Sequence, residues 1–385
     1  MAIKILKSVR GIILFLKVCG LWPNHNRHYV LYMIYAVTFQ FIFTFCYVVC
    51  KFTIFFYLTE VHLITKTLFL WLGEAAFVIK VFNFHYHNKE LQQLLASIKT
   101  FQIRNEMEND LLKRRQLMFN KIALCYVGCA GVAVFFSLVS PLFSSERTLP
   151  YPSWYPVDWH NNTFNYCLLY AYQVIGIFFM AFAIILLETF AVYLMIMMSV
   201  HTDILAMRLK RLGVHATEID DKIIETDHRN YLNLIECFQM HSTSSSLQKS
   251  FENVFSIPFF IQFLVSGAIL CVTVFQIVMM NPANEIVNFV FYLSYFMTLS
   301  TEIFLPCYFG TEQLLKNAQL TTAIYSSNWI GRPIYYQKMI PIFMEYTKDP
   351  RYLIAGKLFN LSLSNFLLVL NRMYNMYAVL MNVFD

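Results

Sequence analysis

The sequence predicts an all-α integral membrane protein with seven transmembrane helices, a cytoplasmic N-terminus and an extracellular C-terminus. Of its 385 residues, 58% are hydrophobic and 14% are charged, whereas soluble domains carry roughly 25% charged residues. The apolar residues form runs long enough to cross a bilayer. The basic residues fall in every second connecting segment, which is the pattern that marks cytoplasmic loops.

The distribution of Lys and Arg sets the orientation. Four segments hold five or six basic residues each and are expected in the cytoplasm: 1–28, 85–117, 201–250 and 310–357. Three segments hold a single basic residue between them, Arg147, and are expected outside: 58–61, 144–165 and 281–284. The net charge of +6 therefore belongs to inner loops, and we expect no nucleic-acid partner.

The chain begins with a basic, amphipathic stretch, residues 1–28. Lys17 interrupts its apolar residues, and Trp22-Pro23 follows where a signal peptide would have small residues at a cleavage site. We therefore expect a helix lying in the plane of the inner leaflet. Seven spans should follow, at 29–57, 62–84, 118–143, 166–200, 255–280, 285–309 and 358–384.

These spans divide the chain into three parts. Residues 1–309 would form the in-plane helix and a bundle of six spans. Residues 310–350 would be a cytoplasmic helical anchor, and residues 351–385 would carry the seventh span. Span 4 is longer than one crossing at ~1.5 Å per residue, so its inner end should project into the cytoplasm.

Two details of the interior can be predicted. Helical pieces within 201–250 would extend spans 4 and 5, with a helix break at Ser242–Ser246. Glu74 lies in the middle of span 2, where a carboxylate is costly unless it faces protein or water. We therefore expect Glu74 to point into the bundle, and we favour a structural ion pair or hydrogen bond over contact with a ligand or an ion. Lys66 and Glu74 are not expected to be ligand charges.

The sequence contains no recognisable catalytic or cofactor motif. It has neither a Walker loop nor a dinucleotide fingerprint, and its ten His and nine Cys lack metal-ligand spacing. We expect no enzyme activity, cofactor, metal or disulfide framework. A metabotropic seven-helix receptor and a transporter remain alternatives. The Asp-Arg-Tyr and Asn-Pro-x-x-Tyr signatures of G-protein-coupled receptors are absent, and no inverted repeat is visible.

One external segment carries a modification motif. The loop 144–165 contains Asn161-Asn162-Thr163, an acceptor pattern for N-glycosylation. Because the charge distribution independently places this loop outside, Asn161 is the expected glycosylation site.

The C-terminal part of the chain contains a set of motifs in a distinctive order and spacing: Leu320–Trp329, Ala355–Lys357, Leu361–Phe366, Val369-Leu370 and Tyr374. These motifs resemble the signature of the insect odorant receptor family, and the resemblance extends over essentially the whole chain. The segment Gly20–Pro23 is similar to that family's N-terminal motif. Departures occur at Asn365, where a threonine is common, at Asn371, where a lysine is common, and at 373–375, which read Met-Tyr-Asn in place of Ser-Tyr-Ser.

The resemblance implies a ligand-gated, non-selective cation channel in the plasma membrane of sensory neurons. Four subunits would surround a pore lined by span 7, and most members of the family assemble with a shared co-receptor. This chain lacks the long inserted loop and the tail of that co-receptor, so it resembles a ligand-tuning subunit of a heterotetramer. A gustatory-type receptor channel is the nearest alternative, but residues 376–377 and 383–384 fit its Thr-Tyr…Gln-Phe signature poorly.

The resemblance also implies pore and anchor residues. Comparison with the co-receptor tail places Val379 and Val383 at a hydrophobic constriction and Asn382 at an amide ring. Asn375 is a further expected pore residue. A ring of apolar side chains can block ions by excluding water. The polar residues within span 7 suit a pore wall, and a helix packed only on other helices is the alternative. Tyr325 and Trp329 would belong to the subunit anchor.

The family's ligand site lies in the outer half of each subunit, between spans 2, 3, 4 and 6. An aromatic, mostly uncharged lining suits small apolar volatile molecules held by shape and one or two hydrogen bonds. The residues expected there are Leu72, Ala75, Phe135, Tyr172, Ile175, Phe179, Tyr292, Tyr295 and Phe296.

Overall fold

The structure is a computed structural model that describes residues 7–22, 29–57, 61–139, 141, 148–213, 220–280 and 286–384. Within these ranges, the side chains of 7–8, 61–63, 65–66, 69, 220–226 and 379–384 are not described.

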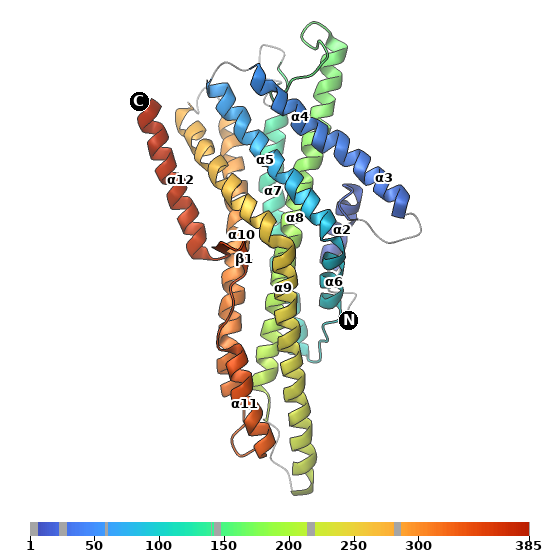
Figure 1. The fold of residues 1–385 in the computed structure, drawn as a ribbon, viewed down its shortest axis with the longest axis vertical. Coiled ribbons are helices and arrows are strands. Elements are labelled where there is room, and N and C mark those ends of the chain that lie inside the picture. The colour runs from blue at the N-terminus through green and yellow to red at the C-terminus, as the bar shows by residue number, and fades with distance from the viewer. Residues whose placement is uncertain are drawn as a thin grey trace.

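The described chain is an elongated bundle of long helices, with α12 on one flank and α11 near the opposite end of the molecule (Figure 1). The elements occur in the following order: α2 Lys7–Val18, α3 Tyr29–Gln40, π-helix η1 Phe41–Phe45, α4 Cys46–Thr53, 3₁₀-helix η2 Ile54–Phe56, α5 Val61–Tyr86, α6 Asn88–Lys99, α7 Glu106–Val139, α8 Thr163–Lys210, α9 Asp220–Met279, α10 Ile286–Tyr325, α11 Ile334–Thr347, β1 Ile354–Ala355, β2 Phe359–Asn360 and α12 Leu363–Phe384.

The predicted fold class is confirmed. Within the described ranges, five helical segments are long and apolar enough to cross a membrane: 29–56, α7, α8, the part of α9 from Asp227, and α10. The remaining two predicted spans correspond to α5, with 26 residues, and α12, with 22 residues. Both are long enough to cross a hydrocarbon core of ~30 Å.

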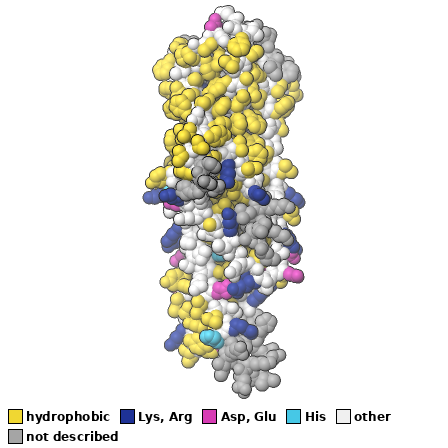
Figure 2. Space-filling view, turned by 90° about the vertical axis from the view of Figure 1, so that its right-hand side faces the viewer, with side chains coloured by type: hydrophobic (Ala, Val, Ile, Leu, Met, Phe, Trp, Pro, Cys, Tyr) yellow, Lys and Arg dark blue, Asp and Glu magenta, His cyan; other side chains and the backbone are white. Residues whose placement is uncertain are grey.

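Side-chain chemistry divides the molecule into two halves. Figure 2 shows hydrophobic side chains over the upper half, and Lys and Arg side chains from mid-height downward. We call these the membrane half and the basic half. The basic half contains α11 and the ends of α8, α9 and α10 that lie near it, and it corresponds to the predicted cytoplasmic side.

Three helices cross the boundary between these halves without a break: α8, α9 and α10, with 48, 60 and 40 residues. The predicted extensions of spans 4 and 5 are therefore confirmed. The expected helix break at Ser242–Ser246 is wrong, because α9 runs through this segment. Thr243 Oγ1 donates to the carbonyl of Gln239 at 2.9 Å, and Ser246 Oγ donates to that of Thr243 at 2.8 Å. The hydroxyls thus bond to their own helix.

Two inner segments are more regular than expected. The polar segment 85–117 contains α6, whose buried Leu91, Leu94, Leu95 and Ile98 recur every three or four residues. The start of the predicted anchor at residue 310 falls inside α10. The anchor segment therefore consists of the end of α10 followed by α11.

Span 7 begins later than predicted, at Leu363 rather than residue 358, because a two-stranded antiparallel hairpin precedes it. Ile354 pairs with Asn360 and Ala355 pairs with Phe359. The hairpin lies against α9, where the backbone N–H of Gly356 donates to the carbonyl of Ser256 at 3.0 Å. Leu361, the residue after the hairpin, lies against α10 at Gly310, where a Cβ atom would come closer than van der Waals contact to the carbonyl oxygen of Leu361. Next to it, the backbone N–H of Leu363 donates to Thr311 Oγ1 at 3.0 Å. Gly310 and Thr311 thus fix where α12 starts.

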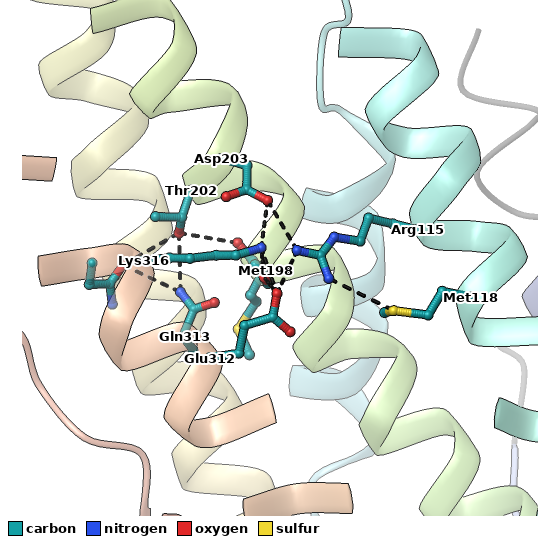
Figure 3. A network of polar contacts seen from close by, with 10 residues as sticks. Arg115, Met118, Met198, Thr202, Asp203, Glu312, Gln313 and Lys316 are labelled. Atoms are coloured by element: carbon teal, nitrogen blue, oxygen red, sulfur yellow. Dashed lines mark hydrogen bonds and ion pairs between the residues drawn. The ribbon is translucent and has the colours of Figure 1, made fainter. Parts of the chain in front are cut away.

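Charged side chains tie the helices together in the basic half (Figure 3). Arg115 on α7 lies 2.6 Å from Glu312 on α10, and Lys316 lies 2.5 Å from Asp203 on α8 and 2.7 Å from Glu312. Burial acts to raise the pKa of Glu312, but hydrogen bonding to Lys316 and the nearby charges outweigh it, so the pKa lies below its usual value. This network joins three helices on the predicted cytoplasmic side.

Candidate functional site

A cavity of ≈ 180 Å³ lies inside the membrane half, among α5, α7, α8, α9 and α10. Its size follows from small residues at positions that face the interior. Ala130 and Ala133 on α7 are 4% exposed, and Gly73 and Ala76 face them from α5. On α7, the lining residues Tyr126, Ala130, Ala133, Val134 and Ser137 recur every three or four positions, as expected for one face of a helix.

Aromatic rings and hydroxyl groups shape the cavity wall. Tyr126, Tyr151 and Tyr295 line it from α7, the loop before α8 and α10. The hydroxyl of Tyr151 is hydrogen-bonded to Ser137 Oγ at 2.6 Å. The wall thus combines apolar surface with a few hydroxyl groups, the composition typical of a small-molecule site.

The loop before α8 holds Tyr151 in place through a buried amide. Gln173 is fully buried. Its Oε1 accepts from the backbone N–H of Tyr151, and its Nε2 donates to the carbonyl of Tyr151, both at 3.0 Å. Nε2 also donates to the Tyr155 hydroxyl at 3.2 Å. Farther along the loop, the N–H of Trp154 donates to the carbonyl of Cys50 at 3.0 Å. These bonds fix the loop over the cavity.

Glu74 points into the bundle, as predicted, and forms an ion pair with Lys51 of α4. Lys51 is 1% exposed, and its Nζ lies 4.7 Å from the ring centre of Tyr47 and 4.1 Å from that of Tyr151. The pair is therefore enclosed by aromatic faces, which stabilise a desolvated cation. Glu74 also lines the cavity, so it belongs both to the ion pair with Lys51 and to the candidate ligand site.

A second buried ion cluster contributes Lys80 and Glu302 to the cavity lining. Lys80 Nζ on α5 lies 2.6 Å from Glu188 Oε1 on α8 and 3.2 Å from Glu302 Oε1 on α10. Gln262 on α9 donates through Nε2 to Glu188 Oε2 at 3.3 Å and to the carbonyl of Glu302 at 2.9 Å. The Lys80 ammonium thus pairs with two carboxylates, and the cluster joins α5, α8, α9 and α10.

The structure brings one of the nine predicted ligand residues, Tyr295, to the lining of this cavity. Phe135 and Ile175 are 60% and 43% exposed and lie on outer surfaces. The rotation of α7 and α8 about their own axes explains this placement, since Val134 on α7 and Ile177 on α8 line the cavity instead.

The other six predicted residues lie near the cavity wall or on another side of α8. Tyr172 donates to the carbonyl of Ile42 at 2.7 Å, and the ring of Phe179 lies 5.0 Å from that of Phe39, so both pack against α3 and η1. The four remaining residues are partly or fully buried outside the lining: Leu72, Ala75, Tyr292 and Phe296.

Sequence reasoning missed the contribution of α9. Gln262, Val265, Ser266 and Ile269 line the cavity, and they share one helix face. Two polar residues, Gln262 and Ser266, which lie one turn apart in a span without charged residues, are the signal that could have indicated this face. Most of the lining is uncharged, although Glu74, Lys80 and Glu302 also take part.

The predicted pore helix has an open surface. None of the described side chains from Leu363 to Ala378 is buried, and Asn375 is exposed. The side chains of Val379, Asn382 and Val383 are not described, so the expected constriction stays a prediction. The structure describes only the helical backbone of α12 at these positions. In Figure 1, α12 stands at the edge of the bundle, and its C-terminal end points away from the basic half.

The predicted anchor and glycosylation residues lie at the surface. Tyr325 is 64% exposed, and Trp329 Nε1 donates to its carbonyl at 3.1 Å. Ile330 and Ile334, next to them, are 77% and 71% exposed. At the other end of the molecule, Asn161 is exposed and donates through Nδ2 to Asp158 Oδ2 at 3.0 Å.

These features together define a multi-pass membrane protein with an internal ligand-sized cavity. The model of the family described as "7tm Odorant receptor" matches residues 60–374. The chain therefore belongs to the odorant receptor family of insects.

Individual relatives agree with this assignment. Odorant receptor 94a of Drosophila melanogaster is 25% identical over 330 residues, which cover 83% of this chain and 80% of the relative. Odorant receptor Or1 of Anopheles gambiae is 23% identical and covers 96% of this chain and 94% of its own. The solved structure of the insect olfactory receptor OR5 from Machilis hrabei matches with a TM-score of 0.86 at 17% identity, over 99% of both chains. Its complex with eugenol matches with a TM-score of 0.87 at 16% identity, over 99% of both chains.

Proposed function

We propose that this chain is a ligand-tuning subunit of an odorant-gated, non-selective cation channel that works with the family's co-receptor in the plasma membrane. The cavity in the membrane half would bind a small volatile molecule, and α12 would form part of the pore wall. The observation that carries this proposal is the cavity itself, which lies within a bundle of the same fold as a receptor solved with eugenol.

The chemistry of the wall supports a small, largely apolar ligand. Phe77, Ile177, Met180 and Ile269 supply apolar surface, while Tyr295 and its neighbouring tyrosines supply hydroxyl groups. Burial of apolar area would provide most of the binding free energy, at roughly 25 cal/mol per Å². One hydroxyl contact would then orient the ligand.

A physical route from the cavity to α12 runs along α10. This helix provides Tyr295 to the lining and Glu302 to the ion cluster. Two turns farther on, Gly310 and Thr311 contact the segment that starts α12. A ligand that shifts α10 would therefore act on the base of the pore helix through direct contacts, with no need for a distant pathway.

Two surfaces support assembly with other subunits. The described side chains of α12 leave it without a buried face, although it belongs to the membrane half. In the anchor, Tyr325, Ile330 and Ile334 form an exposed apolar surface next to Trp329. Exposed patches of this kind commonly mark subunit interfaces. We propose that both become covered in a heterotetramer.

The test is to express the chain with and without a co-receptor and to record whole-cell current while G-protein signalling is blocked. A panel of small volatile alcohols, esters and phenols, including eugenol, serves as the probe. The channel proposal requires a ligand-dependent cation current that survives the block. A current that disappears under the block would instead assign the chain to metabotropic signalling.

A further inference from the structure

Arg372 is the only charged residue of α12, whose sequence from Leu363 to Phe384 contains no other Lys, Arg, Asp or Glu. It is the tenth of 22 residues, so it lies ~13 Å from the start of the helix at ~1.5 Å per residue. This places its Cα near the middle of a hydrocarbon core of ~30 Å. Its side chain is exposed.

No acidic group neutralises Arg372 within the described part of the chain. The adjoining membrane segments, Phe255–Met279 of α9 and Ile286–Thr301 of α10, contain no Asp or Glu in their sequences. Glu302, the next residue of α10, is buried and lies 3.2 Å from Lys80. An unpaired guanidinium at this depth is costly in lipid, and such groups normally face water or a protein partner.

The surroundings of Arg372 favour water. Arg372 is one of the residues that line a second cavity, of ≈ 200 Å³, between α9 and α12, and the small residues Gly267 and Ala268 of α9 line the same cavity. Asn371 and Asn375, both exposed, lie beside it on the outward side of α12. Since residues three and four apart are neighbours on a helix, these amides and the guanidinium form one polar strip on a surface that nothing else in the described chain covers.

We propose that Arg372 projects into the water of the ion path, where it acts as a fixed positive charge that determines which cations pass and how fast. This inference rests on the proposed role of α12 as a pore helix. A unit charge about 8 Å from a passing ion in water lowers the local concentration roughly twofold for a monovalent cation and roughly fivefold for a divalent one, per copy. The subunit would thus lower conductance and disfavour Ca²⁺ relative to Na⁺.

The first experiment compares three variants, expressed with the co-receptor and opened by the same ligand. Arg372→Gln should raise single-channel conductance roughly twofold and the Ca²⁺-to-Na⁺ permeability ratio two- to threefold, because the divalent ion feels twice the field. Arg372→Lys keeps the charge and should remain near wild type. Lys89→Gln removes an exposed charge from α6, on the side of the bundle away from α12, and should change neither quantity.

The second experiment tests exposure to water directly. Arg372→Cys should show the raised Ca²⁺ permeability of the Gln variant. A membrane-impermeant trimethylammonium methanethiosulfonate should restore the wild-type ratio, while the sulfonate reagent should raise the ratio further. The wild-type chain, treated in parallel, accounts for its nine native cysteines.

Two outcomes would overturn the inference. In the first outcome, ligand-gated current is normal, Arg372→Gln leaves the permeability ratio unchanged, and Arg372→Cys responds to neither reagent. This outcome would refute the role of Arg372 and leave the pore helix untouched. The absence of any ligand-gated current from the wild-type assembly would remove the pore helix as well. The two failures are therefore distinguishable.

Discussion

Lys80 Nζ lies 2.6 Å from Glu188 Oε1 across 108 positions of the sequence, and this contact joins α5 to α8 at the wall of the cavity. Glu302 is the second carboxylate on the same ammonium, at 3.2 Å. A buried ion cluster of this kind adds little net stability compared with apolar residues, but removal of one partner leaves an uncompensated charge in the interior.

Lys80→Met should therefore destabilise the receptor by roughly 3–5 kcal/mol, because it leaves Glu188 and Glu302 facing each other without a cation. Thermal unfolding of the detergent-purified protein and cell-surface labelling measure the effect. The triple variant Lys80→Met, Glu188→Gln, Glu302→Gln should recover most of the loss, since no charge then remains in this cluster. A single variant as stable as wild type would contradict the cluster's role.

Filling the cavity should abolish ligand responses without unfolding the protein. Ala133 is 4% exposed and faces the cavity, so Ala133→Phe should raise the half-maximal ligand concentration by tenfold or more by occupying the ligand's volume. Val132, the adjacent residue, is 43% exposed on the outer surface, and Val132→Phe is the matched control. Dose–response curves at equal surface expression decide the matter, and equal shifts in both variants would refute the cavity as the ligand site.

The contact of Gly310 with Leu361 should be sensitive to a single methyl group. Gly310→Ala forces the backbone of Leu361 away from α10, and crowding of this kind costs roughly 1–3 kcal/mol. A Cβ atom added to Gly128 on α7 would meet nothing within 4 Å, so Gly128→Ala should be neutral or should stabilise by up to ~1 kcal/mol. The unfolding temperature should fall in Gly310→Ala and stay the same or rise in Gly128→Ala. Ligand-gated current should also fall in Gly310→Ala if α10 acts on α12 through this contact.

Acid should weaken the basic half through His201. This residue lies in the part of α8 beyond the predicted membrane span, is 4% exposed and stacks on Phe101 with ring centres 4.1 Å apart. Burial, with a further contribution from Arg208, lowers its pKa from 6.5 to about 4. The unfolded chain therefore binds a proton that the folded chain excludes, so stability falls as the pH drops below 6.5.

The expected loss between pH 7.5 and pH 5 is roughly 2 kcal/mol. Thermal unfolding at the two pH values measures this loss, and His201→Phe should reduce the pH dependence by about that amount because Phe keeps the stacking and cannot titrate. The same pH dependence in His201→Phe and wild type would show that other groups are responsible.

The fold could be predicted well from the sequence because bilayer length and loop charge are local signals. The positions and order of the seven spans needed only these signals, and the family motifs supplied the rest. Helix continuity through Ser242–Ser246 was not predictable in this way, because hydroxyl side chains can either break a helix or bond to its own carbonyls.

The cavity was harder to predict because it depends on helix rotation, which depth along a span does not determine. A shift of one residue turns a side chain by about 100°, so Phe135 lies outside while Val134 lines the cavity. The partners of Lys80 are 108 and 222 positions away, and no local pattern pairs them. The short hairpin before α12 likewise depends on distant contacts, since Gly356 bonds to Ser256 of α9.

The unbroken course of α10 through the membrane boundary has a consequence for variation within the family. Inserting a single residue near Pro306 would rotate everything after it by about 100°, turning the Tyr325 surface away from its present direction while the cavity stayed as it is. An insertion of seven residues, close to two full turns, would preserve that angle within about 20°. Tolerated length changes at this junction should therefore follow the helical repeat, because α10 fixes the direction of the Tyr325 surface relative to the cavity.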